Sequence, residues 1–259
     1  MTEVKQPDKR YDLLVWDWGG TIMDSTPTIV QCIQQACRDL GFKVPDDSLA
    51  SSVIGLGIHD SLRRAVPWIE PMHFPKLTER FRYHYLTKDH ELHLFEGIRE
   101  LLHDLRAQGY LLGVATGKSR VGLNRSLAFH DLAHVFHETR TADESFSKPH
   151  PGMLLELSDV TQVPVRRMLM IGDTTHDLDM AANAGVDAVA VTYGAHPTDT
   201  LKSSASLTHV DNVSELSKWL QDNLTIQTAV YWTLVILRNC RNGSQSKRAC
   251  KSTVGTSGT

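Results

Sequence analysis

The residue types that can carry out chemistry in this chain of 259 residues stand directly after short apolar runs. Asp17 follows the apolar run Leu13–Trp16 and opens a glycine turn, Gly19-Gly20, that leads to the hydroxyl of Thr21. A carboxylate in such a turn is placed for nucleophilic attack, and glycine leaves room for a ligand. Asp17 is therefore the candidate nucleophile, with Thr21 beside it.

Three further segments place polar groups in a comparable setting. Thr116 ends an apolar run and offers a hydroxyl that can hold a phosphoryl oxygen, and Lys148 supplies a fixed cation. Asp173 and Asp177 follow another apolar run, where carboxylates can hold Mg²⁺ together with water and a phosphate. Phosphoryl transfer needs this neutralisation, because a carboxylate nucleophile is otherwise repelled by a phosphate dianion.

These segments resemble, in order and spacing, the motifs of haloacid dehalogenase superfamily hydrolases over about residues 10–220, and they are most similar to phosphoglycolate phosphatases. The resemblance implies a Mg²⁺-dependent phosphomonoester hydrolase that forms an aspartyl-phosphate on a small phosphorylated metabolite. It implies catalytic roles for Asp17, Thr116 and Lys148, substrate binding by Thr21, Gly117, Lys118, His59 and Arg63, and metal binding by Asp17, Gly19, Asp173 and Asp177.

One position departs from the resembled motif, which is aspartate-x-aspartate-glycine-threonine. Gly19 stands where those phosphatases have the second aspartate, which protonates the leaving alkoxide and then deprotonates the hydrolytic water. General acid–base help of this kind is typically worth about 10²–10⁴-fold, or roughly 3–5 kcal/mol of barrier. Magnesium binding is expected to survive, since the family uses the backbone carbonyl here. We expect impaired turnover.

Three explanations of Gly19 compete. Phosphonoacetaldehyde hydrolases also have a small residue here, but the segment Ile54–His59 lacks the Schiff-base lysine expected there. Dehalogenases have a bulky residue and need no metal, whereas Asp173 and Asp177 favour one. A phosphoglycolate phosphatase-type enzyme that has lost its acid fits best. The alternatives are a non-catalytic phosphometabolite-binding protein on the same scaffold and a phosphonatase-like hydrolase.

Simpler roles compete for several of these residues. Asp173 and Asp177 could cap the N-terminus of a helix, and the accompanying motifs favour the functional role. Lys118 could be a solvated lysine at a helix start, and His59 and Arg63 could lie on a solvated helix face. The 13 histidines of the chain show no recognisable zinc pattern.

The alternation of apolar runs with helical patterns predicts an α/β fold with a Rossmann-like, doubly wound parallel sheet. Ligands bind such sheets beyond the carboxyl ends of the strands, where the candidate groups stand. The predicted strands are Leu13–Trp16, Leu111–Ala115, Met168–Ile171 and Ala188–Val191, and helical patterns include Ile98–Gln108, Pro151–Thr161 and Leu178–Ala184.

Residues 25–94 interrupt this alternation with an all-helical pattern. Ser25-Thr26-Pro27 is typical of a helix start, and further helices are predicted from Asp46, over His59–Val66 and over Pro71–Leu86. A helical insert after the first strand is expected to form a lid over the site. The predicted domains are a core of residues 1–24 and 95–225 and a helical cap of residues 25–94.

Charge and composition limit the possible partners. The formal charge is −3, and removing the five basic residues that lie beyond residue 224 leaves −8 for residues 1–224, which argues against nucleic acid. The N-terminus lacks the apolar core of a secretory signal, and the four cysteines show no metal-type pairing. We expect a cytoplasmic enzyme, monomeric or homodimeric.

The C-terminal segment of residues 226–259 is predicted to be a disordered, basic tail, because its last part is rich in serine, glycine, lysine and arginine. Its apolar run, Thr228–Leu237, is roughly half as long as a helix that spans a bilayer. No membrane association is expected.

Overall fold

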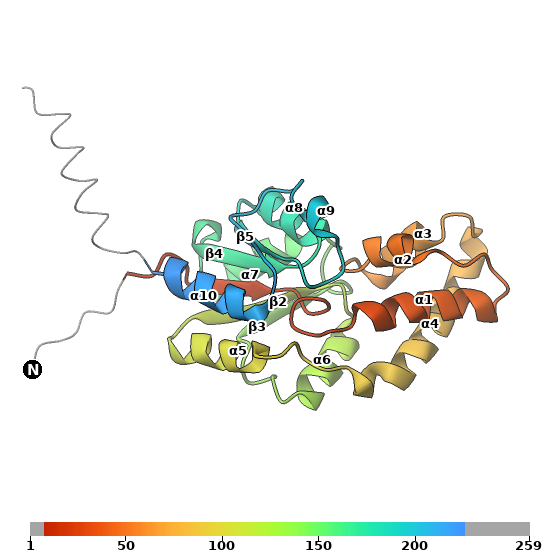
Figure 1. The fold of residues 1–259 in the computed structure, drawn as a ribbon, viewed down its shortest axis with the longest axis horizontal. Coiled ribbons are helices and arrows are strands. Elements are labelled where there is room, and N and C mark those ends of the chain that lie inside the picture. Colours follow the sequence, from red (N-terminus) through yellow and green to blue (C-terminus); the bar gives the residue numbers. More distant parts are fainter. Residues whose placement is uncertain (1–7, 226–259) are drawn as a thin grey trace, which may run out of the picture. The chain divides into compact units, whose positions relative to one another are not determined.

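A parallel β-sheet forms the centre of the protein. The computed structural model describes residues 8–225, of which residues 10–224 form one compact unit. The sheet has six strands in the order β3-β2-β1-β4-β5-β6. Strands β2, β3, β4 and β5 are labelled in Figure 1. The strands are β1 (Leu13–Trp16), β2 (Leu111–Thr116), β3 (Glu138–Thr141), β4 (Met168–Gly172), β5 (Asp187–Val191) and β6 (His209–Val210). The strand order reverses at β1, which creates the crevice in which ligands of such sheets bind.

The register of the central strands brings their carboxyl ends to one level. Trp16 of β1 pairs with Val114 of β2 on one side and with Ile171 of β4 on the other. The residues that follow these pairs therefore leave the sheet side by side. Strand pairing alone places Asp17, Thr116 and Asp173 together at the carboxyl ends of the strands.

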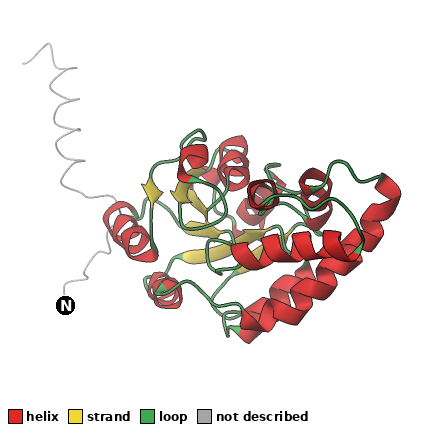
Figure 2. Cartoon of the chain, turned by 45° about the vertical axis from the view of Figure 1, so that its right-hand side comes forward, coloured by secondary structure: helices red, strands yellow, loops and turns green. Residues whose placement is uncertain are grey.

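Helices cover both faces of the sheet (Figure 2). Side chains alternate along β1, so that Leu14 and Trp16 pack on one face and Leu13 and Val15 on the other. The first face is covered by α5 (Ile98–Ala107), α6 (Arg120–Phe129) and α10 (Val213–Asn223), and the second by α7 (Gly152–Thr161), α8 (Thr175–Ala184) and α9 (Thr198–Leu201). Burial on both faces explains why β1 is apolar throughout.

The segment between β1 and α5 is helical and builds its own apolar cluster, which includes Ile33, Leu62 and Leu77. It lies beyond the carboxyl ends of the strands, on the right of Figure 1. Its helices are α1 (Thr26–Asp39), α2 (Asp47–Ser52), α3 (Ile58–Ala65) and α4 (Phe74–Lys88), with short 3₁₀ turns at Pro71–His73 and Asp89–Glu91. We call this helical segment the cap.

The predicted fold class is confirmed: a parallel, doubly wound α/β sheet. Two strands, β3 and β6, and a 3₁₀ turn at Val165–Arg167 were not predicted from the sequence. Among residues 8–225, no helix has the length and apolarity needed to cross a membrane. The predicted tail of residues 226–259 lies outside the described residues.

Candidate active site

Asp17 is the first residue after β1 and is almost completely buried. Its backbone N–H donates to the carbonyl of Ile171 at 2.9 Å, which extends the pairing with β4 by one residue. The chain then turns sharply at Gly20, whose φ of +94° lies in the left-handed region. A Cβ atom at Gly20 would overlap the carboxylate of Asp173, so glycine is required there.

Lys148 joins two of the predicted carboxylates. Its Nζ donates to Oδ1 of Asp17 and to Oδ1 of Asp177, the latter at 2.6 Å, and all three side chains are buried. Burial by itself lowers the pKa of Lys148, but the two carboxylates outweigh it and hold that pKa above its ordinary value. Lys148 is therefore an ammonium group that fixes the position of Asp17.

Asp177 combines the two roles that the sequence analysis left open. Thr174 is the N-cap of α8, and its hydroxyl accepts from the backbone N–H of Asp177 at 3.3 Å. Asp177 Oδ2 accepts in return from the backbone N–H of Thr174 at 3.1 Å, which completes a capping box. Oδ1 of the same carboxylate accepts from Lys148. The helix cap thus orients the group that holds the lysine.

Asp173 is held by two donors. Oδ1 accepts from the Thr21 hydroxyl at 2.8 Å, and Oδ2 accepts from the backbone N–H of Ala195 at 2.8 Å. The hydroxyl of Thr21 is therefore used to position a carboxylate. Thr21 is not one of the residues that line the cavity described below, so the structure does not bring it to the predicted substrate site.

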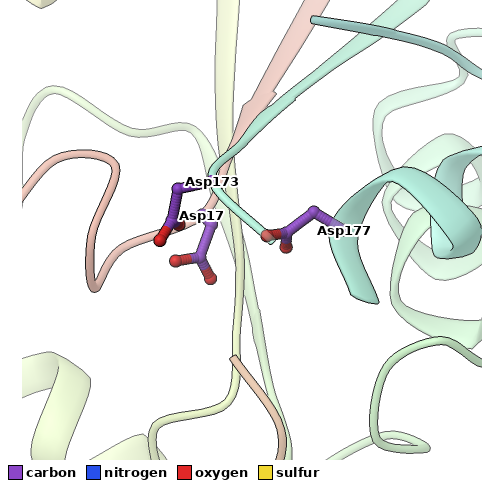
Figure 3. A group of neighbouring side chains, drawn as sticks. All are labelled: Asp17, Asp173 and Asp177. Atoms are coloured by element: carbon purple, nitrogen blue, oxygen red, sulfur yellow. The ribbon is translucent and has the colours of Figure 1, made fainter. Parts of the chain in front are cut away.

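The carboxylates fit a divalent cation. Asp17, Asp173 and Asp177 each offer an oxygen, and these oxygens lie within 4.8 Å of one another (Figure 3). Oδ2 of Asp17 is buried and has no hydrogen-bond partner. Burial raises the pKa of Asp17 to about 6 and that of Asp173 well above its ordinary value. These hard oxygen ligands and their net negative charge suit a hard divalent cation.

A cavity of about 490 Å³ extends from these strand ends toward the cap. Asp17, Gly19, Thr116 and Gly117 lie along its core side. A Cβ atom at Gly19 would lie 2.9 Å from the hydroxyl oxygen of Ser25, which is buried and makes no hydrogen bond. Gly19, the position at which the sequence resemblance predicts a second aspartate, thus lines the cavity together with the candidate nucleophile.

Lys118 reaches the cavity from the core and contacts Tyr85, a residue that was not predicted from the sequence. Its Nζ donates to the Tyr85 hydroxyl at 2.5 Å and lies 4.6 Å from the centre of the Tyr85 ring. Burial lowers the pKa of Lys118 to about 8. His59 and Arg63 are exposed on α3 and do not line the cavity, so the structure does not bring these two predicted residues to the site.

The cap contacts the core through backbone groups of residues 52–57. The carbonyl oxygen of Ser52 accepts from Nε2 of His176 at 3.0 Å and from Nε2 of His196 at 3.1 Å. Nδ1 of His196 accepts from the backbone N–H of Thr175, so Nε2 carries the proton. The backbone N–H of Gly57 donates to the hydroxyl of Ser147 at 2.9 Å. These contacts hold the cap over the strand ends.

Comparison with known proteins identifies the family. The model of haloacid dehalogenase-like hydrolases matches residues 14–191, and the chain belongs to this family. It is 33% identical over 211 residues to a probable phosphatase, IndB, of Dickeya dadantii (79% of this chain, 91% of the relative). It is 30% identical over 217 residues to a phosphoglycolate phosphatase of Aliivibrio fischeri (80% and 94%).

A solved structure of the same fold supports this assignment. The crystal structure of a predicted phosphoglycolate phosphatase from Haemophilus somnus superimposes with a TM-score of 0.73 at 25% sequence identity, covering 81% of this chain and 97% of that one. The resemblance inferred from the motifs is thus confirmed at the level of the family.

Proposed function

We propose that the protein is a Mg²⁺-dependent phosphomonoester hydrolase of the phosphoglycolate phosphatase type that works through an aspartyl-phosphate at Asp17. The observation that carries the proposal is the state of Asp17: one carboxylate oxygen is held by Lys148, and the other is buried, unpaired and next to the cavity. The expected enzyme class, a phosphatase of the haloacid dehalogenase-like family, agrees with the family match and the named relatives.

The proposed reaction has two displacement steps. The Asp17 carboxylate attacks phosphorus, the bond to the ester oxygen breaks, and that oxygen leaves with the electron pair. Water then attacks the phosphorus of the aspartyl-phosphate, which releases inorganic phosphate and restores the carboxylate. Lys148 keeps Asp17 ionised and in position, and the Thr116 hydroxyl is buried at the end of β2 beside the cavity, where it can donate to a phosphoryl oxygen.

The metal would neutralise charge on the phosphoryl group and on Asp17. Asp17 and Asp173 would hold it with the carbonyl of Gly19, and Asp177 would act through Lys148. The absence of a carboxylate at position 19 leaves the leaving oxygen and the attacking water without their acid–base group, and we propose reduced turnover for this reason. We also propose a cytoplasmic, monomeric or homodimeric enzyme that acts on a small phosphorylated metabolite.

The test is hydrolysis of 4-nitrophenyl phosphate with and without Mg²⁺, with Asp17→Asn as the control. A nitrophenolate leaves without a proton, so we expect Mg²⁺-dependent release that Asp17→Asn abolishes. The absence of acid–base help favours a burst followed by a slow steady state. Binding of phosphate without any release of nitrophenol, burst included, would favour the second candidate, a non-catalytic phosphometabolite-binding protein, to which Gly19 points.

A further inference from the structure

We propose that the substrate is an aryl phosphate, the monophosphate ester of a phenol, with the phosphate at Asp17 and the aromatic ring against the apolar side chains of the cavity under the cap. This inference rests on the proposed function and specifies the substrate class of the same site. Two independent observations lead to it: the lining of the cavity and the missing group at Gly19.

The cavity is large and apolar on the cap side. Its volume of about 490 Å³ falls within the range of sites that bind drug-sized ligands, roughly 300–1,000 Å³. The cap side chains that line it are mainly aliphatic or aromatic, among them Ile29, Ile33, Leu56, Leu62 and Phe81. A two-carbon carboxylated phosphate such as phosphoglycolate would leave most of this surface without contact, whereas an aromatic ring system would cover it.

Three cationic side chains line the described part of the cavity, and two of them have partners within this chain. Lys118 donates to the Tyr85 hydroxyl, and Nε of Arg125 donates to Oδ2 of Asp89 at 2.7 Å. Arg82 is exposed. A buried carboxylate on the substrate would need a cation in the apolar part of the cavity. Apart from these three cations, the described cap residues that line the cavity are mainly aliphatic or aromatic, which favours an uncharged ring over a second anionic group.

Two aromatic side chains of α4 offer a surface for a ring. Phe81 and Tyr85 stack with centroids 5.9 Å apart and an angle of 18° between their planes, and both line the cavity. Aromatic pairs of this kind favour further offset-stacked or edge-to-face contact with a ligand ring. The Lys118 ammonium lies over Tyr85 and hydrogen-bonds its hydroxyl, which fixes the ring in place.

The chemistry at Gly19 selects the same class of ester. When the bond between phosphorus and the ester oxygen breaks, the electron pair stays on that oxygen. An alkoxide needs a proton at this moment, whereas a phenolate is weakly basic and leaves without one. The missing acid therefore lowers the rate of bond breaking less for an aryl ester than for an alkyl ester. The phenolate then takes its proton from solvent, and water supplies the oxygen that releases phosphate.

Four phosphates separate the contributions of ring and leaving group. We would measure kcat/KM with Mg²⁺ for 2-naphthyl phosphate, phenyl phosphate, acetyl phosphate and 2-phosphoglycolate. Naphthyl and phenyl esters have leaving groups of similar acidity, so their ratio reports the cavity. We expect 2-naphthyl phosphate to exceed phenyl phosphate by about tenfold and both to exceed 2-phosphoglycolate. Acetyl phosphate has a good leaving group without a ring and should fall below both aryl esters.

A matched pair of variants tests the position of the ring. Phe81→Leu keeps an apolar side chain in the cavity but removes the ring, and Tyr83→Leu makes a comparable change on the same helix at a side chain that is 55% exposed. Phe81→Leu should lower the naphthyl-to-phenyl ratio several-fold, on the order of the worth of an aromatic pair. Tyr83→Leu should leave the ratio unchanged.

Binding to Asp17→Asn gives a measurement that does not depend on turnover. By calorimetry with Mg²⁺, this variant should bind 2-naphthyl phosphate at least about tenfold more tightly than 2-phosphoglycolate. The inference would be overturned if the naphthyl ester bound no more tightly than 2-phosphoglycolate. It would also be overturned if the kcat/KM for 2-phosphoglycolate equalled that for the aryl esters. Either result would leave the proposed phosphatase activity itself intact. Hydrolysis of none of the four compounds, together with preferential naphthyl binding, would instead contradict the proposed function.

Discussion

The substitution Gly19→Asp should convert the protein into a faster alkyl phosphatase. The backbone of Gly19 lies outside the left-handed region, so an aspartate can adopt it without the strain expected at Gly20. The new Cβ atom would lie 2.9 Å from the Ser25 hydroxyl oxygen, which is tight. That hydroxyl makes no hydrogen bond and can rotate away, so the fold should accept the change.

The expected gain follows from the role of the restored group. A placed general acid–base group is typically worth about 10²–10⁴-fold, or roughly 3–5 kcal/mol of barrier. Turnover of 2-phosphoglycolate or another alkyl phosphate should rise by this factor. Phosphorylation by an aryl phosphate should gain less, because its leaving group needs no proton, while hydrolysis of the aspartyl-phosphate should become faster for both substrates.

Steady-state phosphate release and rapid-quench measurement of the phosphorylated protein separate the two steps. Gly19→Asn is the control that has nearly the same shape but no acid, and Gly19→Asp combined with Ser25→Ala removes the tight contact. Mg²⁺ affinity should change little if position 19 contributes its carbonyl. If neither the single nor the double variant raises alkyl-phosphate turnover above that of Gly19→Asn, the loss of this carboxylate is not what limits the enzyme.

Four further changes test the site. Asp17→Asn should abolish phosphatase activity and phosphorylation while the fold stays intact, and activity within twofold of the parent would exclude Asp17 as the nucleophile. Lys148→Met leaves two buried carboxylates without a counter-ion and should lower the free energy of unfolding by about 3–5 kcal/mol. A decrease below about 1 kcal/mol in a urea titration would contradict the buried ion pair. Gly20→Ala should destabilise far more than Gly41→Ala, measured by thermal unfolding, because both glycines have positive φ but only at Gly20 would the Cβ overlap Asp173. Without metal, the pKa of Asp17 is about 6 in the folded protein against an ordinary 3.8, so its contribution to stability is present in full below pH 3.8 and is lost as the pH rises through about 6. The unfolding free energy of the parent relative to Asp17→Asn should therefore fall by up to about 3 kcal/mol from pH 4 to 7 without metal, and by much less with Mg²⁺; a rise over this range would reverse the sign of the argument.

The sequence predicted the centre of the sheet but not its edges. β1 and β4 are buried on both faces, so their continuous apolar runs are unmistakable. β3 reads Glu-Thr-Arg-Thr and lies at one edge of the sheet, where only its last residue is fully buried. β6 is two residues long at the other edge. Edge strands face solvent and need little apolar surface, so hydrophobic runs do not reveal them.

The candidate site, too, could be predicted from the sequence only in part. The candidate groups at the strand ends could be predicted from the sequence, because neighbouring parallel strands end at a common level. The register of β1 with β2 and β4 shows this common level. Tyr85 could not be found, because the helical pattern of α4 does not show which side meets the core. The pattern of α3 contains a partial signal: with Leu62 and Ala65 as its buried residues, the helical period turns Arg63 outward, whereas it places His59 at the flank of the buried side and does not by itself predict the exposure of His59.

Gly117 has a consequence for how this enzyme could acquire new substrates. A Cβ atom there would overlap the Leu56 carbonyl oxygen and would lie 2.6 Å from that of Gly55, so the end of β2 and the cap meet main chain to main chain. Any larger residue at position 117 must push the cap away from Asp17. The separation between the cap and the end of β2 is therefore set by contact between two peptide backbones. In the proposed enzyme, adaptation to another alcohol would have to come from cap side chains that line the cavity, such as Ile33 and Phe81, which can change size without altering this backbone contact.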